Sequence, residues 1–228
     1  MISAAFSPST PTERNHVAPT PPGHTPALRR RWPLVVLIAL ALLGTLWLAV
    51  CHAVLDSPRV DPPRRSDALL VLGPPDPTRV AFAEDLVYNQ HIADTVVFST
   101  PDAQPFDPPE MVQYYTGRSF CAPHEGVEVL CFKPDPSTTQ GEAMKLRELA
   151  EQRGWKTVTA VTFTQHVPRS RLILERCFPG ELRMSAVDFN ISGKNLLVQY
   201  LHQSAGYVKA WLTPGCDQQL PWHPKSGD

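Results

Sequence analysis

The sequence predicts an α/β protein with a doubly wound, mostly parallel, Rossmann-like sheet that has helices on both faces and is preceded by one transmembrane helix. Two observations predict this fold class. Over residues 67–216, short apolar runs alternate with segments whose apolar residues recur at helical spacing, which is the pattern of parallel strands joined by right-handed crossovers. Upstream, the stretch from Leu34 to Val50 carries no charge, and about 20 apolar residues span a bilayer as a helix.

The N-terminal part predicts a tail, an anchor and a linker. Residues 1–31 are rich in proline and poor in large apolar side chains, so we expect a disordered cytoplasmic tail. Residues 32–55 form the anchor helix, and 56–66 link it to the domain. The arginines at 29–31 favour a cytoplasmic N-terminus, and hence a domain outside the cytoplasm, on a bacterial-type plasma membrane crossed once.

Two alternatives to an uncleaved anchor exist. In a cleaved signal peptide the apolar core is usually shorter, and here the preceding tail is also too long. The segment Leu48-Ala49-Val50-Cys51 is similar to a lipoprotein signal, which would place a lipid on Cys51, but Val50 stands where a small residue is needed.

Composition excludes some partners. The net charge is -1 and the sequence has no basic stripe, so we expect no nucleic-acid partner. The 25 prolines cluster in residues 8–33, 58–77 and 101–109, which we interpret as tail, linker and loops. A second tail is expected over residues 217–228.

In the first half of the domain, Ala68 to Leu72 is a continuous apolar run, as in a parallel strand buried on both faces. Apolar residues at helical spacing then predict a helix over 78–91. A strand over 94–99, a short helix over 108–115 and a strand over 127–132 follow.

In the second half, a helix that begins near Thr139 ends at Gly154, a residue that commonly terminates helices. A strand is expected over 157–163, a helix from 166 or 167 to Cys177, and a fifth strand over 183–187. A long closing helix is predicted from the helical spacing of Leu197, Tyr200, Leu201, Ser204, Val208 and Leu212, and we expect its aromatic residues to be core.

Four cysteines, an even number, follow the anchor, and in an oxidising compartment they permit three pairings. Cys121 and Cys131 flank a short loop, whereas Cys177 ends one helix and Cys216 follows the last. We predict the pairs Cys121–Cys131 and Cys177–Cys216. Unpaired thiols and metal ligands are the alternatives, but without Cys-x-x-Cys spacing or an adjacent His we predict no metal site.

The candidate site lies where strands end. The run Val158–Phe163 ends in a turn that holds Thr164, His166 and Arg169, and the last two share one face of the next helix. Thr139 and Glu142 have the spacing of a helix capping box. Together the two segments predict two helix N-termini with free backbone N–H groups beside one pocket.

Each candidate residue has a functional and a structural interpretation. His166 is a candidate general acid or base, or a packing residue. Arg169 suits a phosphate or carboxylate, or an ion pair with Glu142. Arg79 at a helix start is unfavourable unless an anion lies there, so it could clamp the same ligand. Ser99 ends a strand but lacks the Gly-x-Ser-x-Gly context of a nucleophile.

No cofactor can be assigned. The turn after the first strand, Gly73-Pro-Pro-Asp-Pro, lacks the GxGxxG pattern, so ordinary NAD or FAD binding is not expected. Asp76 in this turn is interpreted as a solvated loop acid.

The chain resembles the YdcF-like family, also called SanA/ElyC-like or domain of unknown function 218, over residues 66 to about 190. The resemblance rests on the first strand ending in Gly73, on Arg79, on Thr139-Gln-Gly-Glu142 and on Val161-Thr-Phe-Thr-Gln-His166-Val-Pro-Arg169-Ser170. Phe163 stands where the family usually has Ser. The resemblance implies a role in cell-wall or lipid-carrier metabolism, with Glu142 facing a pocket beside His166. The ligand-binding residues would be Arg79, Arg169, Thr139, Gly73, Ser99 and Thr164.

Three functions are therefore open. The first is an envelope protein that binds or processes a phosphorylated, lipid-linked or sugar-linked intermediate, with His166 exchanging a proton while Arg79 and Arg169 offset negative charge. The second is a non-catalytic envelope sensor or scaffold. The third is an S-adenosylmethionine or nucleotide binder, for which a cytoplasmic domain would be needed.

Overall fold

The computed structural model describes residues 28–103, 107–189, 191 and 193–217. The chain divides into two compact units, Met1–Leu43 and Gly44–Asp228. The predicted C-terminal tail, apart from Asp217, and all but the last four residues of the predicted N-terminal tail lie outside the described residues.

Helix α1, Leu28–Cys51, continues as a π-helical turn over His52–Asp56. Within it, the segment Arg31–Asp56 has a mean hydropathy of 2.8 and is long and apolar enough to cross a membrane. The helix begins at Leu28, so residues 28–31 belong to it and not to the predicted tail. The sequence prediction began the helix after the arginine triplet, whereas Leu28 and the three arginines are already helical.

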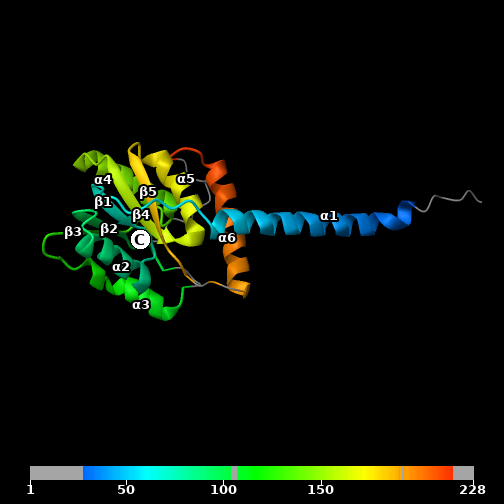
Figure 1. The fold of residues 1–228 in the computed structure, drawn as a ribbon, viewed down its shortest axis with the longest axis horizontal. Coiled ribbons are helices and arrows are strands. Elements are labelled where there is room, and N and C mark those ends of the chain that lie inside the picture. The colour runs from blue at the N-terminus through cyan, green and yellow to red at the C-terminus, as the bar shows by residue number, and fades with distance from the viewer. Residues whose placement is uncertain (1–27, 104–106, 190, 192, 218–228) are drawn as a thin grey trace, which may run out of the picture. The chain divides into compact units, whose positions relative to one another are not determined.

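The second unit contains a five-stranded, all-parallel sheet in the order β3-β2-β1-β4-β5, which confirms the predicted fold class (Figure 1). The strands are β1 Ala68–Val71, β2 Thr95–Ser99, β3 Glu128–Phe132, β4 Thr157–Phe163 and β5 Glu181–Val187. Strands β1 and β4 are neighbours, and from β1 the chain proceeds first to one side of the sheet and then to the other. In such sheets the crevice for a ligand lies at this switch point, outside the carboxyl ends of the strands.

Helices cover both faces of the sheet (Figure 1). They are α2 Pro77–Glu84, α3 Pro109–Gly117, α4 Thr139–Arg153, α5 Val167–Cys177 and α6 Gly193–Leu212, with short turns at Asp85–Asn89, Ser119–Cys121 and Thr164–His166. The sheet has a hydrophobic core on each face, and successive residues of β1 point into opposite cores. Leu70 packs in the core with residues of α4 and α5, whereas Leu69 and Val71 pack with residues of α2 and α3.

Both predicted disulfides are present. Cys121 and Cys131 join the segment after α3 to β3, and Cys177 and Cys216 join the end of α5 to the segment after α6. Among the described residues Cys51 is the free cysteine, and it is buried.

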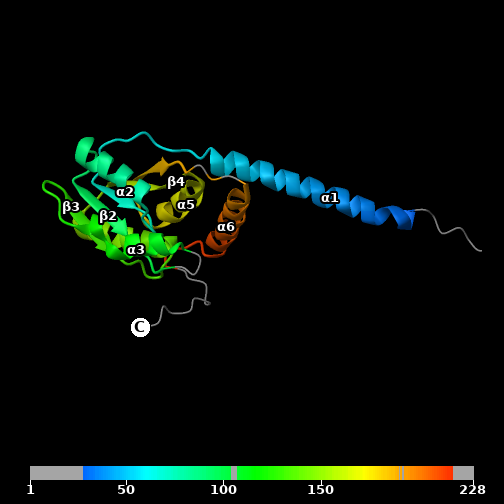
Figure 2. The ribbon, with the colours of Figure 1, turned by 90° about the horizontal axis from the view of Figure 1, so that it is seen from below.

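The predicted closing helix is present, but the prediction that its aromatic residues are core is wrong for Trp211. Tyr200 is buried as expected, whereas Trp211 is 81% exposed, and Leu197, Leu201, Val208 and Leu212 are also exposed. The residues that face the domain include Gln203 and Ala210, which the apolar pattern did not mark. Figure 2 shows α6 beside α5.

Candidate functional site

The structure brings most of the predicted site residues to the carboxyl edge of the sheet. Gly73, Ser99 and His166 lie at or just after the ends of β1, β2 and β4. Thr139 and Glu142 lie in the first turn of α4, and Arg169 lies in the first turn of α5. Residues far apart in the sequence meet here because all five strands are parallel and end at the same edge.

The predicted capping box at α4 is wrong. The N-cap is Thr138, whose side chain accepts a hydrogen bond from the Gly141 N–H. Glu142 is therefore one residue too far along the helix to serve as the box partner. Its Oε1 instead accepts a hydrogen bond of 2.7 Å from the Gly73 N–H, which ties α4 to the end of β1.

Glu142 is buried, with 3% of its surface exposed. Burial raises the pKa of its carboxyl to about 7, although the Gly73 N–H, the Ser99 hydroxyl and the positive charges of Arg79 and Arg169 act in the opposite direction. The Ser99 hydroxyl is itself buried and has no hydrogen bond of normal geometry to any described residue. Near neutral pH this carboxyl can thus take up or release a proton.

His166 is buried between two hydroxyl groups. Its Nδ1 lies 3.0 Å from Thr162 Oγ1 and its Nε2 lies 3.3 Å from Thr139 Oγ1, and its ring stacks on Phe163. Burial, together with the nearby cations Arg169 and Arg79, lowers the pKa of the imidazole well below its usual value. The ring is therefore neutral at pH 7, with one nitrogen donating and the other accepting.

Arg79 has an anion beside it, but the anion is part of the protein. Its Nε donates to Asp76 Oδ2 at 2.6 Å and its Nη1 donates to the Leu72 carbonyl at 2.9 Å. The other carboxylate oxygen of Asp76 caps α2 by accepting from the N–H groups of Thr78 and Arg79. Asp76 is thus not the solvated loop acid that the sequence predicted. It neutralises Arg79 and the positive end of α2 at once.

Arg169 is held differently. Its Nε donates to Gln203 Oε1 at 2.8 Å, and its stem lies against Gly206 of α6. A side chain at position 206 would place its Cβ 2.6 Å from Arg169 Cδ. The predicted ion pair with Glu142 does not form, and neither terminal nitrogen of Arg169 hydrogen-bonds to a described residue.

A pocket of about 40 Å³ opens beside Arg169, several times the space that one water needs. Three cationic residues line it: Arg169, Arg176 and Lys209. No carboxylate is among the described residues that line it, which are Thr138, Thr139, Gln140, Arg169, Ile173, Arg176, Cys177, Gly206, Lys209, Ala210, Thr213 and Gly215. Burial and the charge of Arg169 lower the pKa of Lys209, as expected for cations crowded around a space suited to an anion.

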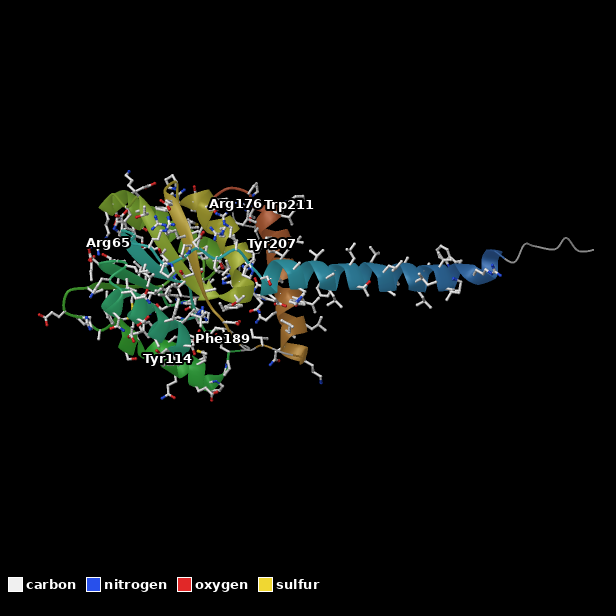
Figure 3. All side chains as sticks on the ribbon, in the orientation of Figure 1. Arg65, Tyr114, Arg176, Phe189, Tyr207 and Trp211 are labelled. Carbon is white, nitrogen blue, oxygen red and sulfur yellow. A yellow bond between two sulfur atoms is a disulfide. The ribbon has the colours of Figure 1, made fainter. Side chains whose placement is uncertain are left out.

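Arg176 joins the end of α6 to this pocket. Its Nη1 donates to the carbonyls of Ala210 and Thr213, which are left without helical partners where α6 ends. Figure 3 shows Arg176 near Trp211 at this end of α6, with Tyr207 one turn earlier.

Thr139 connects the pocket to His166. It lines the pocket, and its hydroxyl is 3.3 Å from His166 Nε2. A chain of polar groups therefore runs from the pocket through Thr139 and His166 to Thr162. Gly73, Ser99, Arg79 and Glu142 lie outside the pocket lining.

Thr164 is not brought to this cluster. Its hydroxyl donates to the Val187 carbonyl and to Asp188 at the end of β5. Sequence reasoning also missed residues that the site uses, above all Thr162, Gln203, Arg176 and Lys209. Thr162 carried a signal, because it lies in β4, four residues before His166. The other three come from α5 and α6, whose packing no local pattern shows.

The described residues contain no group of three His, Cys, Asp or Glu side chains that could hold a metal ion. Comparison with protein-family models and with curated proteins gives no match for this chain.

Proposed function

We propose that the protein is a membrane-anchored, extracytoplasmic protein of the cell envelope whose YdcF-like domain binds or processes a phosphorylated, lipid-linked or sugar-linked intermediate. The observation that carries the proposal is the pocket between α4, α5 and α6. The described residues that line it include Arg169, Arg176 and Lys209 and no carboxylate, and Arg169 has two terminal nitrogens that no described residue engages. A planar guanidinium with free donors is suited to phosphate oxygens.

The compartment is supported by two further features. The segment Arg31–Asp56 can cross a membrane by its length and composition. The pairs Cys121–Cys131 and Cys177–Cys216 are the kind of disulfide that persists in oxidising compartments. On this basis the arginines at 29–31 would face the cytoplasm and the sheet would lie on the other side.

If the domain is catalytic, the proton exchange passes through Thr139. Neutral His166 can accept a hydrogen bond from the Thr139 hydroxyl at Nε2, which would turn the Thr139 oxygen toward a group in the pocket. Arg169, Arg176 and Lys209 would offset the negative charge that develops there. The earlier expectation that Arg79 shares this task is weakened by its ion pair with Asp76.

The test is a calorimetric titration of the full chain in detergent micelles with inorganic phosphate and with a short-chain polyprenyl phosphate. We expect saturable binding that weakens about tenfold or more in Arg169→Gln, since a hydrogen bond to a charged group contributes about 1.5–3 kcal/mol. Lys209→Gln should weaken it too, without removing the Gln203 contact. Binding to the lipid phosphate alone would identify a lipid-linked ligand.

The matched control is Arg153→Gln, which removes an arginine of α4 that pairs with Glu128 and lies outside the pocket. Its affinity should equal that of the wild type. Equal affinity in all four proteins, or no binding to the wild type while it melts cooperatively, would reject the proposal in favour of a sensor or scaffold.

A further inference from the structure

Helix α6 exposes a continuous apolar surface. Six large apolar side chains of this helix are between 46% and 81% exposed, and Trp211 is the most exposed: Leu197, Val198, Leu201, Val208, Trp211 and Leu212. Leu197, Leu201, Val208 and Leu212 are separated by four, seven and four residues, which places them on one side of a helix. A patch of this kind marks a site of contact with another apolar partner.

The opposite side of α6 binds the domain. Tyr200, Gln203 and Ala210 are buried, and Gly206 lies against Arg169. The exposed side chains therefore lie on the side of α6 that points away from the domain, and a small shift of the helix would not bury them. They form a second face, which the described residues of the second unit leave exposed.

The same helix contacts the end of the candidate membrane span. Trp47 donates from Nε1 to Ser204 Oγ at 3.2 Å and packs edge-on against Tyr200. Cys51 lies 3.7 Å from the same Ser204 hydroxyl, and the Tyr200 hydroxyl donates to Asp56. These contacts cover the last ten residues of the span Arg31–Asp56, which lie in the same compact unit as α6.

The charge of α6 also suits a membrane surface. The helix contains Lys194 and Lys209 and no acidic residue, whereas burial and the charge of Arg169 lower the pKa of His202, so that this imidazole adds no charge near neutral pH. Helices that lie in the bilayer interface combine an apolar face that carries Trp and Leu with a basic polar face, and they bury the apolar face about 5–10 Å deep. Tryptophan, as at position 211, is enriched at that depth.

We propose that α6 is an interfacial membrane helix, which lays the face formed by Leu197, Val198, Leu201, Val208, Trp211 and Leu212 into the phospholipid bilayer that α1 crosses. The partner is lipid because the anchor brings a bilayer to the side of α6 without any further component. The proposal rests on the anchor and not on the identity of the ligand in the pocket.

The experiment measures tryptophan quenching in full-length protein reconstituted into vesicles of phosphatidylethanolamine and phosphatidylglycerol. Emission of Trp211 is obtained as the difference between wild type and Trp211→Phe, with and without acyl chains brominated near the headgroup. We expect this difference emission to be blue-shifted, to lose most of its intensity in brominated vesicles and to resist quenching by acrylamide.

Trp155 supplies the matched control, because it lies just before β4 at the opposite end of the strand from the site. The difference between wild type and Trp155→Phe should be unaffected by brominated lipid. Trp211 emission that acrylamide quenches and brominated lipid does not would overturn the proposal. So would a blue shift that disappears on dilution of the protein within the bilayer, since the partner would then be a second copy of the chain.

Discussion

At the scale of single residues, the site contains two titratable groups whose charged forms are disfavoured by burial. Glu142 has its pKa raised to about 7 and His166 has its pKa lowered, and both lie near the cations Arg79 and Arg169. The two groups are held by different partners, because Glu142 accepts from the Gly73 N–H whereas His166 contacts the hydroxyls of Thr139 and Thr162. Each can exchange a proton near neutral pH only at the cost of a buried charge.

Glu142 should make stability depend on pH. Its pKa is about 7 in the folded protein and near 4.5 when unfolded, so the folded state holds a proton that the unfolded state releases between these values. Stability must then fall as pH rises through this window, by about 3 kcal/mol at 1.36 kcal/mol per unit. Glu142→Gln stays neutral and keeps an acceptor for Gly73. We expect it to gain stability relative to wild type from pH 5 to pH 8.

Chemical denaturation at pH 5, 6, 7 and 8 measures this difference. His166 adds the opposite slope below its unfolded pKa of 6.5 in both proteins, so the comparison cancels it. Glu148→Gln, on the exposed side of α4, should not show a gain that grows with pH. A difference between Glu142→Gln and wild type that stays constant across the range would show that Glu142 is already ionised at pH 5.

At the scale of elements, the sequence located every strand and domain helix to within a few residues, because apolar runs and helical spacing are local signals. It did not predict which side of α6 would be covered. Leu197 and Leu201 share a face by their spacing, but spacing does not say whether protein or lipid covers that face. The prediction of the capping box was wrong for a similar reason: Glu142 accepts a hydrogen bond from the Gly73 N–H, and spacing within a segment cannot show a partner that is 69 residues away.

Gly206 is where α6 positions the anion site. A Cβ there would meet Arg169 Cδ at 2.6 Å and Nε at 2.7 Å, and the arginine stem can move aside. We therefore expect Gly206→Ala to change the melting temperature little, because alanine gains about 1 kcal/mol of helix propensity. It should displace the guanidinium and weaken phosphate binding about tenfold, the loss of roughly one charged hydrogen bond.

The measurement is the same calorimetric titration, paired with thermal melting. Gly44→Ala is the control, because that glycine is also helical and nothing lies within 4 Å of the added Cβ. It should leave binding unchanged. Wild-type affinity in Gly206→Ala would mean that the approach of α6 to Arg169 does not set the geometry of the pocket.

At the scale of the second unit, α6 contributes to both the proposed anion pocket and the proposed contact with the bilayer. One side of the helix lines the pocket through Gly206, Lys209 and Ala210, and the other side is the apolar face proposed to enter lipid. A helix with its side chains is about 10–12 Å across. A phosphate group in the pocket would then lie about that far from the bilayer, within reach of a lipid chain that remains embedded.

The disposition of the chain across the membrane predicts the state of its five cysteines. Four are paired as Cys121–Cys131 and Cys177–Cys216, whereas Cys51 is free. Disulfides persist in oxidising compartments and are rare in the cytosol.

In cells quenched with acid and then denatured, a bulky maleimide should add to Cys51 alone before reduction, and to all five cysteines afterwards. Cys51→Ser should carry no adduct before reduction, which identifies the free thiol. Four or more adducts on wild type without reduction would place the domain in a reducing compartment. The sheet would then face the cytoplasm, and a nucleotide or S-adenosylmethionine would replace the lipid-linked phosphate as the ligand to test.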